Sequence, residues 1–221
     1  MQVIRSAVAY GAGAAFHTPT ERDGKPRGAT KEFNRIQNAC LRLVLGAYRA
    51  TPARSLETEA ACPPIDLYLN KRLADFEARL EQSGQAERIR EACTAIAARL
   101  RRAPARRQAR AVGHSGWVAS WVADQSPGEA LTREWKARHA RETEMSRGRR
   151  PREVPADSAT FDGSTLKKHK GLRKHKSSVL TQIHTGMIGL RAFLHWRRVP
   201  NIVTPLYRCA REPETVDYII L

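Results

Sequence analysis

Apolar residues recur every three or four positions along much of the first hundred residues, which is the spacing of one helix face. Over 30–47 these positions are Phe33, Ile36, Cys40, Leu43, Val44 and Ala47. The same spacing predicts helices over 65–82 and 86–101. A shorter helix is expected over 51–62, because proline favours the first turn of a helix and two prolines follow Cys62.

The helical pattern resumes at Ser164. Leu172, Val179, Leu180, Ile183 and Met187 predict a long helix that ends near Gly186, and a further helix is expected over 188–198. No segment sustains the strict alternation typical of strands. Short loops join these amphipathic helices, so the pattern predicts a mostly α fold. We expect a helical bundle, a flexible basic middle segment and a short irregular C-terminal tail.

The pattern also divides the chain into three segments. Residues 1–100 form a helical region. Residues 101–163 form a basic, partly disordered linker with short helices. Residues 164–221 form a C-terminal helical segment that ends in the irregular tail. No run of residues reaches the roughly 20 apolar positions of a membrane span, so no membrane partner is expected.

Charge changes the picture from fold to partner. The chain has 39 Lys and Arg against 22 Asp and Glu, a net charge of +17 and a pI near 10.6. Such a chain attracts polyanions, and nucleic acid is the first candidate. Aromatic residues make up 6% of the chain, which is low for a protein that stacks bases. The sequence therefore predicts contact with the RNA or DNA phosphate backbone and no small-molecule substrate.

Two segments concentrate the positive charge. The first, 99–110, contributes Arg101, Arg102, Arg106, Arg107 and Arg110, and also fits a nuclear address. The second, 167–176, contributes Lys167, Lys168, Lys170, Arg173 and Lys174. On a continuous helix Lys167, Lys170 and Lys174 share one side and would lie along a phosphate backbone. Both segments equally fit a solvated basic surface, and that alternative stays open.

Motifs for catalysis and metal binding are missing from the sequence. It contains no P-loop, G-x-S-x-G or H-E-x-x-H. The cysteines Cys40, Cys62, Cys93 and Cys209 are far apart, so we expect reduced thiols in an intracellular protein. His169 and His175 are not four residues apart and do not predict a metal pair. No cofactor is expected.

Phe161-Asp162-Gly163-Ser164 is similar to the first metal-binding strand of ribonuclease H folds. That site requires several more carboxylates to hold two cations, and the residues after Ser164 form a basic helical segment. We therefore expect Asp162 or Ser164 to cap the start of this helix. An enzyme would instead show magnesium-dependent nuclease activity that Asp162→Asn abolishes.

Four stretches resemble non-LTR (LINE-type) retrotransposon reverse transcriptases of filamentous fungi, in the region C-terminal to the polymerase domain. They are Ala9-Tyr10-Gly11-Ala12, FNRIQNACLRLVLGAYRATPARSLETEAACPPIDLYL (33–69), SSVLTQIHTGMIGLRAFLHWRRVP (177–200) and the closing tail. The resemblance makes 1–100 a post-polymerase helical region. His184 stands where the family usually has arginine.

The resemblance implies that the polymerase carboxylates lie upstream and that the ribonuclease H domain is absent, so the chain is not expected to be an enzyme. An upstream polymerase domain becomes a further expected partner. Ile36, Leu43 and Leu73 would be buried against that domain, so in this chain alone they are expected to form an exposed apolar patch. The tail resembles a zinc-binding element in which Cys209 remains, while Tyr207 and Asp217 replace ligands. Structural zinc needs four ligands, so this degenerate element is expected to bind no metal.

These inferences predict a nuclear fragment of a retrotransposon reverse transcriptase, an RNA-directed DNA polymerase, that retains only electrostatic nucleic-acid binding. Two alternatives remain at this point. One is a stand-alone basic helical nucleic-acid-binding protein. The other is a helical structural protein that binds no nucleic acid and whose charge keeps it in solution.

Overall fold

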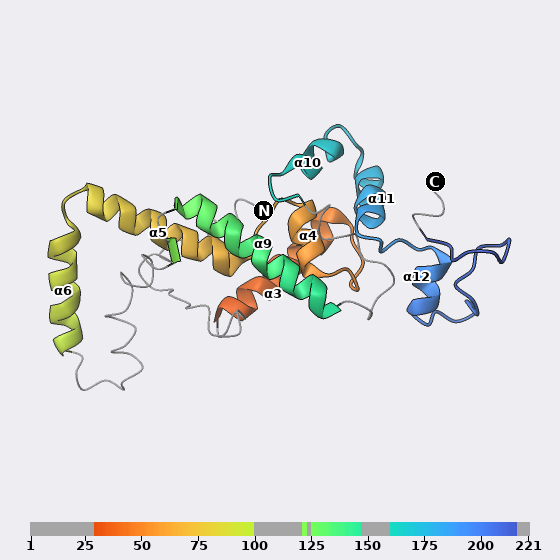
Figure 1. Cartoon of the computed structure of the whole chain (residues 1–221), viewed down its shortest axis with the longest axis horizontal. Coiled ribbons are helices and arrows are strands. Elements are labelled where there is room, and N and C mark those ends of the chain that lie inside the picture. Colours follow the sequence, from red (N-terminus) through yellow and green to blue (C-terminus); the bar gives the residue numbers. More distant parts are fainter. Residues whose placement is uncertain (1–28, 100–120, 123–124, 147–159, 216–221) are drawn as a thin grey trace. The chain divides into compact units, whose positions relative to one another are not determined.

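The computed structural model describes residues 29–99, 121–122, 125–146 and 160–215, and this part of the chain is mostly α-helical, as predicted (Figure 1). Its helices are α3 (Ala29–Leu45), α4 (Ala53–Glu59), α5 (Ile65–Gln82), α6 (Ala86–Arg99), α9 (Pro127–Ser146), α10 (Ser164–His169), α11 (Lys174–His184) and α12 (Arg191–Trp196). No strand occurs among these residues. None of the described helices combines the length and the apolar character needed to cross a membrane.

The chain forms two compact units, each assembled from two separated stretches. The first draws its described residues from Met1–Asn34 and Pro64–Trp135, and the second from Arg35–Pro63 and Lys136–Leu221. The segments 1–100, 101–163 and 164–221 remain a prediction about sequence organisation.

In the first unit, the start of α5 is fixed by side chains of α3. The amide group of Asn34 donates to Asp66 Oδ1 and accepts the backbone N–H of Ile65, both at 3.1 Å. The Ile65 N–H is one of the donors that a helix N-terminus leaves without an intrahelical partner. Ile65 and Leu69 are buried beneath Phe33 and Tyr68. Two hydrogen bonds of Asn34 and one small apolar cluster therefore join the two helices.

The start of α9 carries a reciprocal capping box. The backbone N–H and hydroxyl of Ser126 donate to Glu129 Oε2 at 2.9 and 2.7 Å, and the Glu129 N–H donates to Ser126 Oγ at 3.3 Å. These hydrogen bonds favour the ionised carboxylate, so they lower the pKa of Glu129.

In the second unit, α3 is followed by Gly46, a position at which a side chain would be strained and would collide with α11. Gly46 has φ +67°, and the N–H of Ala47 donates to the Arg42 carbonyl at 3.0 Å, which satisfies a terminal carbonyl. A Cβ at Gly46 would lie 2.1 Å from Ser178 Oγ on α11. Gln182 on α11 donates to the Gly46 carbonyl at 3.0 Å. The turn after α3 is thus the surface on which α11 rests.

The burial of α3 differs from the prediction. Ile36, Leu43 and Val44 are 52, 80 and 52% exposed, whereas Leu41 and Leu45 are buried. Apolar residues occur on two sides of this helix. The buried side carries Leu41 and Leu45, whereas the three-or-four-residue spacing had predicted burial of the side that carries Ile36, Leu43 and Val44. The expected exposure of Ile36 and Leu43 is confirmed, but Leu73 is 3% exposed and belongs to the buried interior.

The predicted long helix from Ser164 to Gly186 is wrong, because the structure has two helices there. α10 ends at His169 and α11 begins at Lys174. Gly171, in the connecting turn, has φ +82°, a left-handed conformation that a continuous helix excludes. The expected single row of Lys167, Lys170 and Lys174 along one helix is therefore also wrong.

The irregular tail is confirmed over its described part. The helix predicted over 188–198 is shorter, Arg191–Trp196, and Phe193 stacks on Tyr48 with ring centroids 5.5 Å apart. After it, an isolated bridge pairs Leu206 with Pro213. Glu214 accepts the N–H of Arg191 at 3.1 Å, which returns the tail to the start of α12.

Candidate nucleic-acid interface and histidine–glutamate cluster

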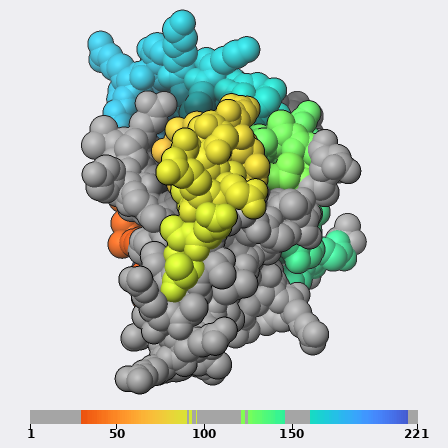
Figure 2. All heavy atoms as spheres, turned by 90° about the vertical axis from the view of Figure 1, so that its left-hand side faces the viewer, coloured from red at the N-terminus to blue at the C-terminus, as the bar shows by residue number. Residues whose placement is uncertain are grey.

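The basic segment 167–176 lies on the surface of the second unit. All six of its lysine and arginine side chains are exposed: Lys167, Lys168, Lys170, Arg173, Lys174 and Lys176. It belongs to a longer acid-free stretch, because no Asp or Glu occurs from Gly163 to Arg211. In Figure 2 the cyan region that begins near residue 160 shows side chains that project from the surface. Six exposed cations within ten residues form a positive surface.

Lys174 differs from the other cations of this segment. Its ammonium group donates to the backbone carbonyls of Leu43 and Val44 in the last turn of α3. These carbonyls carry the partial negative charge of a helix C-terminus, so a cation is favoured there. Lys174 thus joins α11 to the end of α3. The predicted contacts with nucleic acid are therefore expected mainly from the other cations of the segment 167–176.

The structure does not describe the other five arginines that were predicted to contact nucleic acid. Arg101, Arg102, Arg106, Arg107 and Arg110 lie outside the described residues. The predicted cap is confirmed only in part: the N-cap position of α10 belongs to Gly163, and neither Asp162 nor Ser164 occupies it. Asp162, one residue earlier, accepts the N–H of Ser164 on its Oδ1 at 2.9 Å. This hydrogen bond, with a smaller contribution from the charge of Lys167, lowers the pKa of Asp162.

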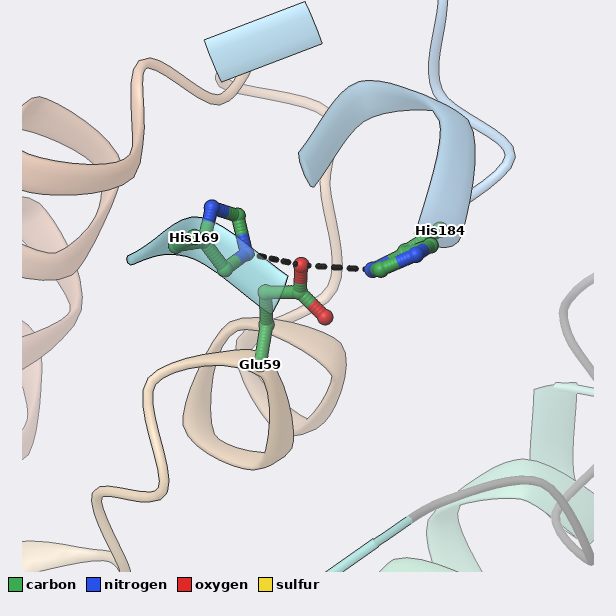
Figure 3. Close-up of side chains that lie close together, drawn as sticks. All are labelled: Glu59, His169 and His184. Atoms are coloured by element: carbon green, nitrogen blue, oxygen red, sulfur yellow. Dashed lines mark hydrogen bonds and ion pairs between the residues drawn. The ribbon is translucent and has the colours of Figure 1, made fainter. Parts of the chain in front are cut away.

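Glu59 of α4, His169 of α10 and His184 of α11 form a cluster in which the three side chains converge (Figure 3). Glu59 Oε1 is 2.8 Å from His169 Nε2 and 2.8 Å from His184 Nδ1. The two imidazole rings are nearly perpendicular, at 86°. The exposed fractions of the side chains are 5% for Glu59, 11% for His169 and 24% for His184. One nearly buried carboxylate oxygen therefore receives both histidines.

Each residue of the cluster is the last residue of its helix. Glu59 ends α4, His169 ends α10 and His184 ends α11. The Thr165 hydroxyl positions α10 by donating to the backbone carbonyls of Thr58 and Glu59, at 3.3 and 3.1 Å. Ser177 Oγ lies 2.8 Å from His169 Nδ1 and orients that ring. Three helix ends therefore meet at one carboxylate.

Sequence reasoning missed this cluster. It assigned no site to Glu59 or His184 and compared His169 only with His175, which is exposed. Glu59 is 110 residues from His169 and 125 from His184, so no local spacing marks the set. The one available signal was His184 itself, because it replaces the arginine usual in the family that the sequence resembles.

The tail that was expected to be a degenerate zinc-binding element shows no comparable cluster among its described residues. Tyr207 and Cys209 are exposed, and Asp217 lies outside the described part of the chain.

No known protein family, curated protein or solved structure matches this chain.

Proposed function

We propose that this chain is a post-polymerase fragment of a non-LTR retrotransposon reverse transcriptase and binds RNA or DNA through the phosphate backbone. The observation that carries the proposed binding is the exposed basic segment 167–176 within an acid-free stretch. The motifs of 33–69 and 177–200 support the proposed origin. The proposal assigns the chain no catalysis and places it in the nucleus.

The exposed cations support binding by counterion release. Each lysine or arginine that neutralises a phosphate releases condensed counterions, which makes affinity fall steeply as salt rises. Because α10, its turn and α11 change direction within ten residues, the cations are distributed over two short helices. Such a distribution suits any flexible or helical phosphate backbone and gives no base readout.

The test is the salt dependence of binding to a short duplex and a short single strand of arbitrary sequence, measured by fluorescence anisotropy. The full chain should show a strong negative slope of log affinity against log salt. Replacing Lys167, Lys168 and Lys170 by glutamine should reduce that slope by about 2 to 3 on duplex DNA.

The matched control removes the same charge elsewhere. Arg72, Arg79 and Arg88 are exposed on α5 and α6, and replacing all three by glutamine should leave most of the slope intact. A slope near zero for the unmodified chain would reject the proposal and favour the non-binding helical protein. Equal losses in both triple variants would reject the segment 167–176 as the contact surface.

A further inference from the structure

The glutamate–histidine cluster has the ligand set of a transition-metal site. Glu59 Oε1, His169 Nε2 and His184 Nδ1 all lie within 4.8 Å of one another. Imidazole nitrogen and carboxylate oxygen are established zinc ligands, and imidazole is a poor ligand for magnesium or calcium. In Figure 3 both rings direct a nitrogen at the same carboxylate oxygen, from opposite sides.

We propose that Glu59, His169 and His184 bind a divalent transition-metal ion, with Zn²⁺ as the expected occupant. The ion would sit between the three ligand atoms and join α4, α10 and α11. This inference is independent of nucleic-acid binding, because none of its ligands belongs to the exposed cations of the segment 167–176.

Binding of an ion requires an adjustment of all three ligand separations. Zinc bonds of about 2.0 to 2.2 Å in a tetrahedral arrangement place ligand atoms about 3.3 Å apart. The observed nitrogen–oxygen separations are 2.8 Å. Binding of the ion would therefore lengthen these two separations by roughly half an ångström and bring the two histidine nitrogens, which lie within 4.8 Å of each other, to a similar spacing. Rotation of the side chains at three helix ends can supply this adjustment.

The surroundings suit a ligated histidine. When Nε2 of His169 binds a metal, the proton must reside on Nδ1, and Ser177 Oγ lies 2.8 Å from that nitrogen as a ready acceptor. The serine hydroxyl can also donate when the metal is absent, so both states are satisfied. The C-terminal end of α11 adds partial negative charge beside His184.

Three ligands leave one coordination position for water. His184 and His169 retain 24 and 11% exposure, so solvent can reach this side of the cluster. Glu59 is the single carboxylate of the set, and the neighbouring stretch 163–211 carries no acid. We therefore expect tighter binding of zinc than of harder divalent ions, but weaker binding than at sites with four protein ligands.

The competing interpretation is a hydrogen-bonded cluster without metal, in which Glu59 simply accepts two N–H groups. Titration of the metal-stripped full chain with Co²⁺ separates the two, because cobalt gives visible ligand-field bands when four-coordinate. One saturable ion per chain, displaced by Zn²⁺, is expected. Helical circular dichroism of the stripped chain must first be intact, and absence of saturable binding then overturns the proposal.

Variants assign the site. Glu59→Gln and His184→Gln keep hydrogen-bonding side chains and should weaken Zn²⁺ binding roughly 100-fold or more, as measured by competition with a chromophoric chelator. His175→Gln is the matched control, since His175 is exposed on α11, and should bind as the unmodified chain does. Cys209→Ser should also leave binding unchanged. Binding that survives Glu59→Gln and His184→Gln, or is lost with Cys209→Ser, overturns the assignment.

If a cluster variant fails to fold, the unmodified chain still decides the question. Zn²⁺ should raise its thermal unfolding midpoint in a concentration-dependent way, whereas Mg²⁺ should not. Equal responses to both ions, or no response to either, would contradict the proposed site.

Discussion

α5 and the segment 167–176 solve the problem of surface charge in opposite ways. Outside the buried Asp66, α5 carries three acids, Asp75, Glu77 and Glu81, and three bases, and Lys71 donates to Asp75 at 2.6 Å. The segment 167–176 has cations only, and the nearest acids in sequence are Asp162 and Glu212. The first surface is locally neutral. The surface of the segment 167–176 has a positive electrostatic potential that extends into solvent. Repulsion among its cations also opposes folding.

The comparison also shows what stabilises a basic segment that lacks its own acids. Acceptor groups elsewhere in the second unit contact this segment and the end of α11. The carbonyls at the end of α3 accept from Lys174, and Glu59 of α4 contacts His169 of the segment and His184 of α11. Partly exposed ion pairs within one helix, such as Lys71–Asp75, contribute only about 0.5 kcal/mol. The contacts of Glu59 with His169 and His184 are more buried than the Lys71–Asp75 pair, so we expect them to contribute more to stability.

Charge reversal should give the largest effect. Replacing Lys167, Lys168 and Lys170 by glutamate should weaken binding to a nucleic acid by about 100-fold or more at low salt, because three phosphate contacts become repulsions. The same reversal at Arg72, Arg79 and Arg88 should change affinity by only a few-fold. Electrophoretic mobility shift at fixed salt measures both, and similar losses would mean that the overall charge matters more than its location.

Removing a buried acid should cost more stability than removing an exposed one. Glu59→Ala leaves two histidines facing each other without their carboxylate and should lower the free energy of unfolding by about 2 to 4 kcal/mol. Asp75→Ala, which breaks the partly exposed pair on α5, should cost at most about 0.5 kcal/mol. Urea denaturation of metal-free protein measures both, and equal costs would contradict the difference between the two surfaces.

Gly46→Ala should loosen the support of α11. The added methyl would meet Ser178 Oγ at 2.1 Å, and alanine is strained at φ +67°. We expect a loss of about 1 to 3 kcal/mol. Gly84→Ala is the matched control, since Gly84 has φ +68° but no atom near its added Cβ. It should lose only the strain, about 1 kcal/mol. Thermal denaturation distinguishes the two.

The smallest effect should be a change in acid stability at Asp162. Its folded-state pKa is lowered from 3.8, so the carboxylate contributes stability above that value, which is lost as pH falls through the folded pKa. Asp162→Asn should flatten the decline of stability below about pH 4. Glu129→Gln, which alters the capping box of α9, should flatten it in the same direction. A steeper decline in either variant would contradict the stabilising role of these carboxylate hydrogen bonds.

Local spacing predicted α3, α4, α5 and α6 well, because caps, prolines and apolar periodicity are written within a few residues of each helix. It failed at Gly171, where one left-handed residue divides the expected helix, since a glycine inside a helical pattern is tolerated in many proteins. It also chose the wrong side of α3. Which apolar face is buried depends on partners elsewhere in the chain.

The basic segment could be predicted as a surface because charge is nearly always solvated, and its exposure is confirmed. The cluster at Glu59 could not, since it requires knowledge that the ends of α4, α10 and α11 meet. No spacing rule connects residues separated by more than a hundred positions. Its histidines became informative only when their ring nitrogens were placed in space.

The meeting of three helix ends at Glu59 also imposes an order on folding. Thr165 reaches the end of α4 across 107 residues, and His184 reaches Glu59 across 125. α3 and α4 are synthesised long before Thr165, His169 and His184. The Glu59 carboxylate therefore stays solvated until residue 184 has been synthesised. Contacts of such long sequence separation slow folding. We therefore expect the second unit to fold late and nearly all at once, when α11 arrives on Gly46.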